Sequence, residues 1–281
     1  MTPWITPEDL RARLDAPELR LVDVRFSLAD PASGRRAYVE GHLPGAAYLD
    51  LELDLSGPVG RHGGRHPLPD PERLAARLGA CGIGPDAWVV AYDDADGMVA
   101  GRLWWLLRWL GHERVQVLDG GFAAWSAAGG ECTTAPPEQE PTDFGPRTQA
   151  DLHVDRDWLL ARLDDPSVVV VDARAPERYR GEVEPLDPRA GHIPGAVNLP
   201  FTGNLEGGRF RPLAALHERY RGLTGADTVV VYCGSGVSAA HDLMALEACG
   251  LRGARLYPGS WSDWVSHADA PVATGPDPRG R

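Results

Sequence analysis

The sequence has few cysteines and no excess of positive charge. Its 281 residues include four scattered cysteines. No two of them have CxxC spacing, which argues against a zinc site and against a disulfide framework. Scattered free thiols suit a reducing compartment, so we expect the protein to be cytoplasmic. The formal net charge of −12 makes nucleic acid an unfavourable partner. The cysteines are Cys81, Cys132, Cys233 and Cys249.

Long apolar runs are also lacking. No stretch approaches the roughly 20 apolar residues that a membrane-spanning helix needs. The N-terminal segment MTPWITPEDL has neither the basic start nor the apolar run of a secretory signal. We therefore predict no membrane association and no export.

What the sequence does contain is one pattern written twice. The first half holds LVDVR (21–25), GHLPGA (41–46), VVAYDD (89–94) and DGGFAAW (119–125). The second half holds, in the same order, VVDAR (170–174), GHIPGA (191–196), VVVYCG (229–234) and YPGSWSDW (257–264). Matching positions are 139 to 150 residues apart. That spacing is the size of a domain, so the pattern indicates a tandem duplication.

Each copy alternates short apolar strands with amphipathic helical stretches, such as PEDLRARL (7–14) and GRLWWLLRWLG (101–111). This alternation predicts an α/β fold of two tandem domains, each a mostly parallel sheet flanked by helices. Residues 131–149 are rich in proline, threonine and acidic residues and are interpreted as a linker. We thus expect an N-terminal domain over 1–130 and a C-terminal domain over 150–281.

The stretch VVYCGSGVSAA (230–240) is the most informative one. A β-branched run ends at Cys233, a loop with two glycines follows, and a helix is predicted from Ser238 to Ala248. Backbone N–H groups at such a helix start can lower a thiol pKa from roughly 8.5 to about 3.5–7.5. We therefore predict that Cys233 is a nucleophile. A buried structural cysteine is the alternative, but it would need no anion-binding loop. The predicted anion-binding loop consists of Gly234, Ser235, Gly236, Val237 and Ser238.

The two copies differ in chemistry at one place. Aligning the repeats puts Asp93 opposite Cys233, so only the second copy is expected to be catalytic. The first copy has extra residues around DLSGPVGRHGGRHPLP, which contains Arg61, His62, Arg65 and His66. This basic loop could bring positive charge to an anion site, or it could be a solvated surface loop.

Together, the tandem copies, the two GH[LI]PGA segments, the CGSGVS loop and the closing YPGSWSDW resemble a two-domain rhodanese-type sulfurtransferase. The resemblance runs from about Trp4 to Thr274, with Asp263 where glutamate is usual. It implies that the C-terminal cysteine takes a sulfane sulfur from a small donor and holds it as a persulfide. An acceptor thiol, a thioredoxin-like protein or cyanide then removes the sulfur. It also implies an inactive N-terminal domain with aspartate in place of cysteine, and no cofactor or metal.

The loop CGSGV followed by serine is similar to that of 3-mercaptopyruvate sulfurtransferases, whereas thiosulfate-preferring members tend to place basic residues there. The resemblance implies that Ser235 works with a histidine and an aspartate of the first half. These are predicted to be His66 and Asp54, with Asp50 as a competitor for the aspartate.

The donor-binding arginines match the family less closely. Arg178 occupies the position of the first arginine, and a second is often found nine residues later, where this chain has Asp187. Arg189 is the predicted substitute, and Arg180 is the alternative. This departure keeps thiosulfate as an alternative donor.

Two other classes of protein fit the sequence less well. A cysteine phosphatase needs arginine six residues after the cysteine, and this chain has Ala239 there. A non-enzymatic sulfur carrier or regulatory module would use Cys233 without a donor pocket. His42 and His192 occur in both copies, so an architectural role is expected for them.

Overall fold

The chain forms two compact units, each with its own parallel sheet. The computed structural model describes residues 2–280. One unit takes in the chain up to Gly57, then Leu68–Gln149 and Gly207–Phe210. The other takes in Pro58–Pro67, Ala150–Glu206 and the chain from Arg211 onward. The basic loop of the first half therefore belongs to the second unit.

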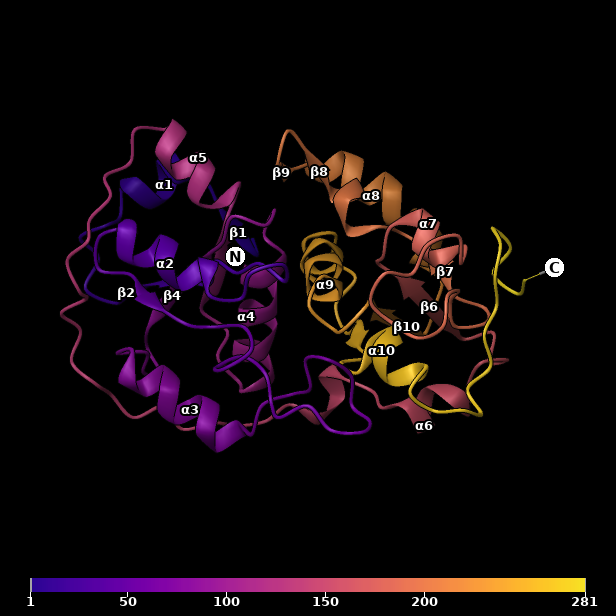
Figure 1. Ribbon diagram of the computed structural model, residues 1–281. Coiled ribbons are helices and arrows are strands. Elements are labelled where there is room, and N and C mark those ends of the chain that lie inside the picture. Colours follow the sequence, from indigo (N-terminus) through magenta and orange to yellow (C-terminus); the bar gives the residue numbers. More distant parts are fainter. Residues whose placement is uncertain (1, 281) are drawn as a thin grey trace. The chain divides into compact units, whose positions relative to one another are not determined.

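The first unit has a five-stranded sheet in the order β1-β5-β4-β2-β3, with every neighbouring pair parallel. Figure 1 labels β1, β2 and β4 of this sheet. Its central strand β4 is buried along its whole length, as a strand with helices on both faces should be. The strands are β1 (Trp4–Ile5), β2 (Leu19–Asp23), β3 (Ala47–Tyr48), β4 (Trp88–Tyr92) and β5 (Val115–Leu118). The helices are α1 (Pro7–Arg11), α2 (Ser33–Glu40), α3 (Pro71–Ala80), α4 (Met98–Trp109) and α5 (Gly121–Ala127).

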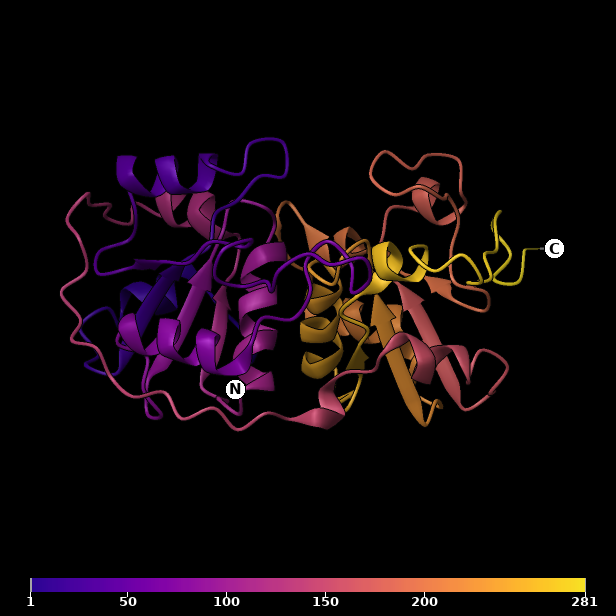
Figure 2. The ribbon, with the colours of Figure 1, turned by 60° about the horizontal axis from the view of Figure 1, so that its bottom comes forward.

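The second unit repeats this plan with a four-stranded parallel sheet in the order β11-β10-β6-β7. Figure 2 shows the strands of each unit side by side with helices around them. The strands are β6 (Val168–Asp172), β7 (Val197–Asn198), β10 (Thr228–Tyr232) and β11 (Arg255–Leu256). The α-helices are α6 (Arg156–Leu160), α7 (Pro176–Tyr179), α8 (Leu213–Tyr220), α9 (Ala239–Ala248) and α10 (Ser260–Trp264).

Several short elements complete the chain. The 3₁₀ helices are η1 (Ala150–Leu152), η2 (Phe201–Asn204) and η3 (Arg221–Leu223). The short strands are β8 (Leu205–Glu206) and β9 (Arg209–Phe210). Strand β9 packs with the first unit, because the Phe210 ring stacks on Trp4 with centroids 3.9 Å apart.

The duplication is visible in a buried aspartate–arginine ion pair that occurs at the same place in both units. In β2, Asp23 binds Arg25 at 2.6 Å, and the guanidinium also donates to the Gly41 carbonyl. In β6, Asp172 binds Arg174 at 2.6 Å, and that guanidinium donates to the Gly191 carbonyl. Removing one partner of a buried ion pair leaves an uncompensated charge, so the D-x-R pairs hold the ends of both strands.

The predicted elements around Cys233 are confirmed. Strand β10 ends at Tyr232, and α9 starts one residue after the predicted Ser238 and ends at Ala248. The stretch 101–111 lies mostly in α4, as expected. Helix α1 is shorter than the amphipathic pattern over 7–14 suggests, because the residues after Arg11 turn towards β2.

The segment 131–149 is not a free linker. It lies along the first unit, where the Thr142 N–H donates to the Gly79 carbonyl and the Gln149 N–H to the Trp109 carbonyl. The Phe144 ring is buried. These bonds explain why the first unit extends to Gln149 rather than ending near residue 130.

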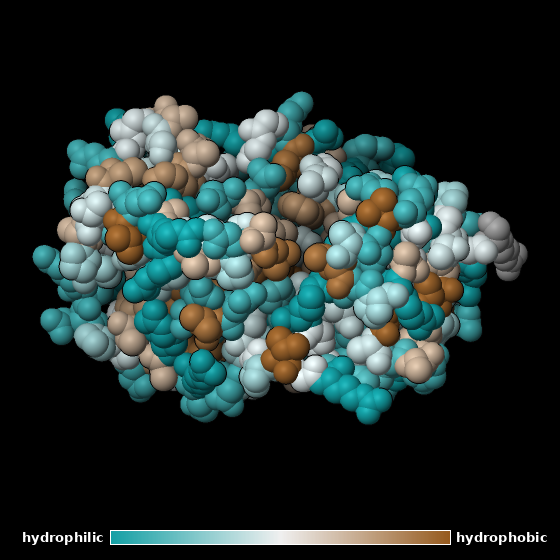
Figure 3. Space-filling view, in the orientation of Figure 1, coloured by the Kyte–Doolittle hydropathy of each residue, from teal (hydrophilic) through white to brown (hydrophobic). Residues whose placement is uncertain are grey.

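The apolar residues on the face shown in Figure 3 are scattered among hydrophilic ones. Single exposed apolar side chains of this kind are normal on a folded protein. Among residues 2–280, the structure contains no helix whose length and apolar character would allow it to cross a bilayer.

Candidate active site

Cys233 lies in the turn between β10 and α9, and its side chain is 2% exposed. The Gly236 N–H points at the sulfur, with the nitrogen 3.1 Å from Sγ. The Cys233 N–H donates to Ser260 Oγ at 3.1 Å, and its carbonyl accepts from the Trp261 N–H at 3.0 Å. The start of α10 thus holds the cysteine backbone, and the Gly236 N–H faces the thiol.

The turn Gly234–Ser238 can have this shape only because residue 236 is a glycine. Gly236 has φ of +76°, and a Cβ placed on it would lie 2.3 Å from the Pro258 carbonyl oxygen. A side chain at this position would therefore strain the backbone and clash with it. Val237 and Ser235 are buried beside it, and Ser238 is the residue before α9.

The first unit has a carboxylate at the equivalent place. Asp93 directly follows β4 and accepts four backbone N–H bonds of 2.8–2.9 Å, from Ala95, Gly97, Val99 and Ala100. Burial raises the pKa of this carboxyl, while the four N–H bonds act in the opposite direction. The turn at this end of the repeat is therefore a site for an anion, and in the first unit the chain supplies the anion itself.

Ser235 meets His66 in the second unit. His66 Nδ1 lies 2.7 Å from Ser235 Oγ, and both side chains are buried. A hydroxyl and an imidazole at this distance can pass a proton between them. The predicted pairing of these two residues thus has the geometry that proton transfer needs.

The loop 58–67 that carries His66 is fastened to α10. The Gly63 N–H donates to Asp263 at 2.7 Å, and the Arg65 N–H donates to Ser262 Oγ at 3.1 Å. Gly64 has φ of +84°, and a Cβ there would lie 2.5 Å from the Gly259 carbonyl oxygen. The glycines before Arg65 therefore let the loop lie directly against the start of α10.

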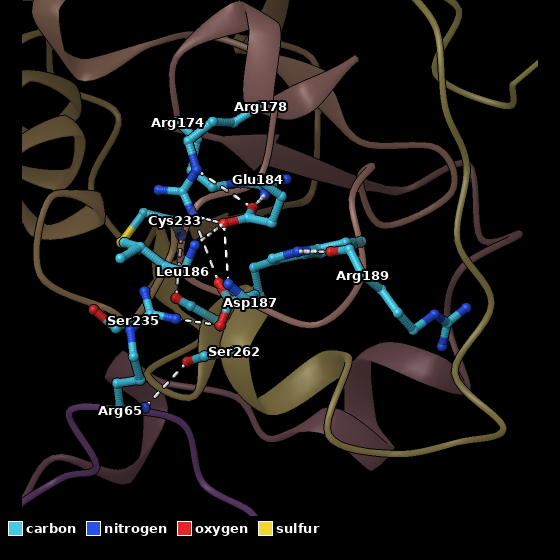
Figure 4. A network of polar contacts seen from close by, with 12 residues as sticks. Arg65, Arg174, Arg178, Glu184, Leu186, Asp187, Arg189, Cys233, Ser235 and Ser262 are labelled. Atoms are coloured by element: carbon cyan, nitrogen blue, oxygen red, sulfur yellow. Dashed lines mark hydrogen bonds and ion pairs between the residues drawn. The ribbon is translucent and has the colours of Figure 1, made fainter. Parts of the chain in front are cut away.

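Two guanidinium groups face the residue after the cysteine. A Cβ placed on Gly234 would lie 3.0 Å from Arg65 Nη2 and 3.4 Å from Arg178 Nη1. Figure 4 shows both arginines directed towards the turn that holds Cys233 and Ser235. Arg178 comes from α7 and Arg65 from the loop 58–67. This pair could bind a planar anion such as a carboxylate.

Acidic side chains form ion pairs with these guanidinium groups. Glu184 binds Arg178 at 2.7 Å and Arg174 at 3.3 Å. Asp187 forms ion pairs with Arg65 and, at 3.5 Å, with Arg178. Burial raises the pKa of Asp187, and Arg65 opposes that rise. The sequence contained one indication of this cluster, because Asp187 stands at the position where the resemblance places a second arginine; it contained none for Glu184.

Arg189 and Arg180 do not join this cluster. The Arg189 guanidinium donates to the Ala270 carbonyl at 3.0 Å and points away from Cys233 (Figure 4). Its own carbonyl accepts the indole N–H of Trp261 at 2.9 Å. Arg180 pairs with Glu182 at 2.7 Å. In this structure Arg65, rather than either of these, is the second arginine beside Arg178.

The two candidate aspartates lie in the first unit. Asp54 binds Arg77 at 3.0 Å and accepts the Asp50 N–H at 2.9 Å. Asp50 accepts the N–H groups of Glu52 and Leu53. Asp54 is thus held by a cation, and Asp50 caps a turn. The choice of the aspartate that assists His66 stays a prediction.

The repeated histidines have equivalent structural bonds. His42 binds the carbonyls of Tyr38 and Ala135, at 2.8 and 2.9 Å. His192 binds those of Tyr179 and Pro278, at 2.8 and 3.2 Å. Each ring also stacks on the neighbouring tyrosine. These bonds agree with the architectural role expected for both residues.

Among the described residues, one cluster has donors that a metal could use. Ligand atoms of His62, Asp263 and His267 lie within 4.8 Å of one another. All three are already engaged, since His62 binds Ser266, Asp263 accepts the Gly63 N–H, and His267 stacks on His62. The cluster fastens the loop 58–67 to the region of α10.

Comparison with known proteins identifies the fold. The Rhodanese-like domain family matches residues 6–128 and again residues 155–267. The chain belongs to the rhodanese family. Both matched segments contain one of the two repeats, so the duplication is a pair of rhodanese-like domains with Cys233 in the second.

Its relatives in this family include named sulfurtransferases. A "Probable 3-mercaptopyruvate sulfurtransferase" of Pseudomonas aeruginosa is 51% identical over 278 residues, covering 96% of this chain and 98% of that protein. A thiosulfate sulfurtransferase of Azotobacter vinelandii is 36% identical over 276 residues, covering 95% and 96%. The crystal structure of the 3-mercaptopyruvate sulfotransferase SseA from Escherichia coli superposes with a TM-score of 0.81 at 30% identity, covering 93% of this chain and 100% of that one.

Proposed function

We propose that this protein is a sulfurtransferase that moves a sulfane sulfur from 3-mercaptopyruvate to a thiophilic acceptor through a persulfide on Cys233. The observation that carries the proposal is the contact of 2.7 Å between His66 and Ser235, because Ser235 lies in the same turn as the buried cysteine. Thiosulfate needs no proton for its cleavage, whereas a thiol donor does. A built proton-transfer pair therefore favours the thiol donor.

In the first step the Cys233 thiolate attacks the sulfur of 3-mercaptopyruvate. The new S–S bond forms as the C–S bond breaks, and the electron pair of that bond leaves on the carbon as an enolate. The thiol proton moves to the enolate carbon, which gives pyruvate and leaves the persulfide as an anion. Ser235 and His66 would carry this proton.

The persulfide anion would be stabilised by the N–H groups of the turn Gly234–Ser238. The Gly236 N–H already faces the sulfur, and in the equivalent turn Asp93 accepts four N–H bonds. Donors fixed before the reaction need no reorganisation, so they stabilise developing charge efficiently. The first domain, with its own anion in place, would be non-catalytic.

In the second step an acceptor thiolate attacks the outer sulfur of the persulfide. The acceptor gains that sulfur, and Cys233 returns as a thiolate. Small thiols, a thioredoxin-like protein and cyanide are acceptors of suitable nucleophilicity. Neither step requires a cofactor or a metal. The described cysteines are free, which supports action in a reducing compartment such as the cytoplasm.

The donor carboxylate would bind Arg178 and Arg65. Both guanidinium groups face Gly234, the residue next to the nucleophile. Thiosulfate remains the second candidate donor, because the same arginines could bind its sulfonate oxygens. In that reaction the thiolate would displace sulfite and leave the same persulfide.

The test compares kcat/KM for 3-mercaptopyruvate and thiosulfate with cyanide as the common acceptor, for the wild type and for Cys233→Ser. The proposal expects a preference for 3-mercaptopyruvate and no turnover in the variant. A preference for thiosulfate would make the second candidate the function. A folded wild type that accepts sulfur once but never turns over would instead be a carrier module.

A further inference from the structure

The arginine cluster beside Cys233 contains as many acidic groups as basic ones. Its cations are Arg65, Arg174 and Arg178, and its anions are Asp172, Glu184 and Asp187. Three formal positive charges meet three negative ones, so the cluster has no net charge. A site that binds an anionic donor would ordinarily be cationic, so one of these carboxylates opposes donor binding.

Asp187 is the carboxylate in the position to do so. Its side chain is 4% exposed and touches both Arg65 and Arg178, the two guanidinium groups that face Gly234. Glu184 has a different place, because it bridges Arg178 to the Asp172–Arg174 pair at the end of β6. Glu184 therefore belongs to the framework, whereas Asp187 occupies the groups that a donor would use (Figure 4).

The cations keep some capacity for another ligand. The buried Nε of Arg65 has no hydrogen-bond partner among the described residues. The contact between Arg178 and Asp187 is long, at 3.5 Å, although Glu184 binds Arg178 at 2.7 Å. A guanidinium carries five donors, so both groups could bind a donor anion if Asp187 were displaced or shared them.

We propose that Asp187 determines donor specificity: it takes the place of the donor's anionic group on Arg65 and Arg178 and disfavours a dianionic donor more than a monoanionic one. This inference rests on the proposed function. Near pH 7 thiosulfate carries two negative charges, and 3-mercaptopyruvate with its thiol protonated carries one. Coulomb energy is proportional to the product of the charges, so the Asp187 carboxylate repels thiosulfate twice as strongly.

The test replaces Asp187 with asparagine, which keeps the shape and removes the charge. With cyanide as acceptor, Asp187→Asn should raise kcat/KM about 10-fold for 3-mercaptopyruvate and about 100-fold for thiosulfate, as expected for one charge partly shielded by the protein. The ratio between the donors would then shift about 10-fold towards thiosulfate. Asp187→Glu keeps the charge and should keep the wild-type ratio.

The matched control is Glu182→Gln, which removes the same charge from the same segment. Glu182 is 55% exposed and pairs with Arg180, outside the cluster. The Glu182→Gln variant should leave the ratio of kcat/KM between the two donors unchanged, since exposed charges are screened. An equal change in kcat/KM for both donors in Asp187→Asn would overturn the inference. So would a rise in KM for both donors, because Asp187 would then be a residue that positions the arginines.

A binding measurement separates this inference from the proposed function. In Cys233→Ser, calorimetry would compare sulfate, a dianion, with pyruvate, a monoanion, with and without Asp187→Asn. Sulfate binding should tighten more than pyruvate binding when the charge is removed; equal tightening would overturn the role of Asp187. If the wild type turned over neither donor, the proposed function would fail. The binding of sulfate and pyruvate would still test the role of Asp187.

Discussion

Ser235 Oγ lies 2.7 Å from Nδ1 of His66, although 169 residues separate the two in the chain. The contact exists because the loop 58–67 belongs to the second unit, where the Gly63 and Arg65 N–H groups bind the side chains of Asp263 and Ser262. The proposed proton transfer at Cys233 would thus use a residue from the half of the sequence that has no cysteine in the equivalent turn.

Replacing His66 with alanine should reduce sulfur transfer from 3-mercaptopyruvate far more than from thiosulfate. Loss of a positioned acid–base group typically costs about 10²–10⁴-fold, and only the thiol donor has a proton to transfer. The measurement is kcat/KM for both donors in His66→Ala and Ser235→Ala. His217→Ala, at an exposed position of α8, is the control. Equal losses for the two donors would show that the pair does not act on a proton.

Arg178 should contribute more to donor binding than Arg189. Arg178→Ala is expected to raise KM for 3-mercaptopyruvate about 10- to 100-fold, because a charge-assisted hydrogen bond of about 1.5–3 kcal/mol is lost. Arg189→Ala should change KM less than threefold, since that guanidinium binds the Ala270 carbonyl. Steady-state kinetics of the two variants decides between them, and a larger effect at Arg189 would restore it as the second donor-binding arginine.

Asp93 should be important for stability and not for chemistry. In Asp93→Ala four N–H groups, three of them in buried bonds, lose their acceptor, so the free energy of unfolding should fall by about 3 kcal/mol or more. Asp94→Ala, at the exposed neighbouring position, should stay within about 0.5 kcal/mol of the wild type. Urea unfolding measures both. A loss of kcat in folded Asp93→Ala protein with unchanged stability would contradict this assignment.

Asp242 should make the protein less stable as the pH rises. This carboxyl on α9 is fully buried, and burial raises its pKa from 3.8 to about 7, although Arg219, Asn204 and Tyr220 oppose the rise. The folded state therefore binds a proton that the unfolded chain releases near its ordinary pKa. The stabilisation is complete below about pH 4 and is lost as the pH rises through about 7.

The measurement is the melting temperature between pH 4.5 and 8 for the wild type and Asp242→Asn. Asparagine stays neutral, so the variant should lack this part of the pH dependence. Its melting temperature relative to the wild type should therefore increase as the pH rises. If the difference between the two proteins is the same at every pH, Asp242 does not titrate in this range.

The sequence by itself determined the duplication and the turn around Cys233. Those features depend on neighbouring residues. The β-branched residues 228–231 lie in the strand β10, Gly236 takes a positive φ that disfavours a side chain, and the apolar stretch to Ala248 forms α9. Such short-range preferences can be read along the chain, and the duplication doubles each of them. Asp93 was predicted to stand opposite Cys233 because the two repeats can be aligned along the chain.

Only the tertiary structure decided which charged groups meet beside the cysteine. Arg65 and Arg178 converge on Gly234, and Asp187 contacts both, although 122 residues separate Arg65 from Asp187. Arg189 is near Asp187 in sequence, yet its side chain points the other way (Figure 4). Long, flexible side chains take their direction from the partners that folding brings to them, and sequence spacing does not encode those partners.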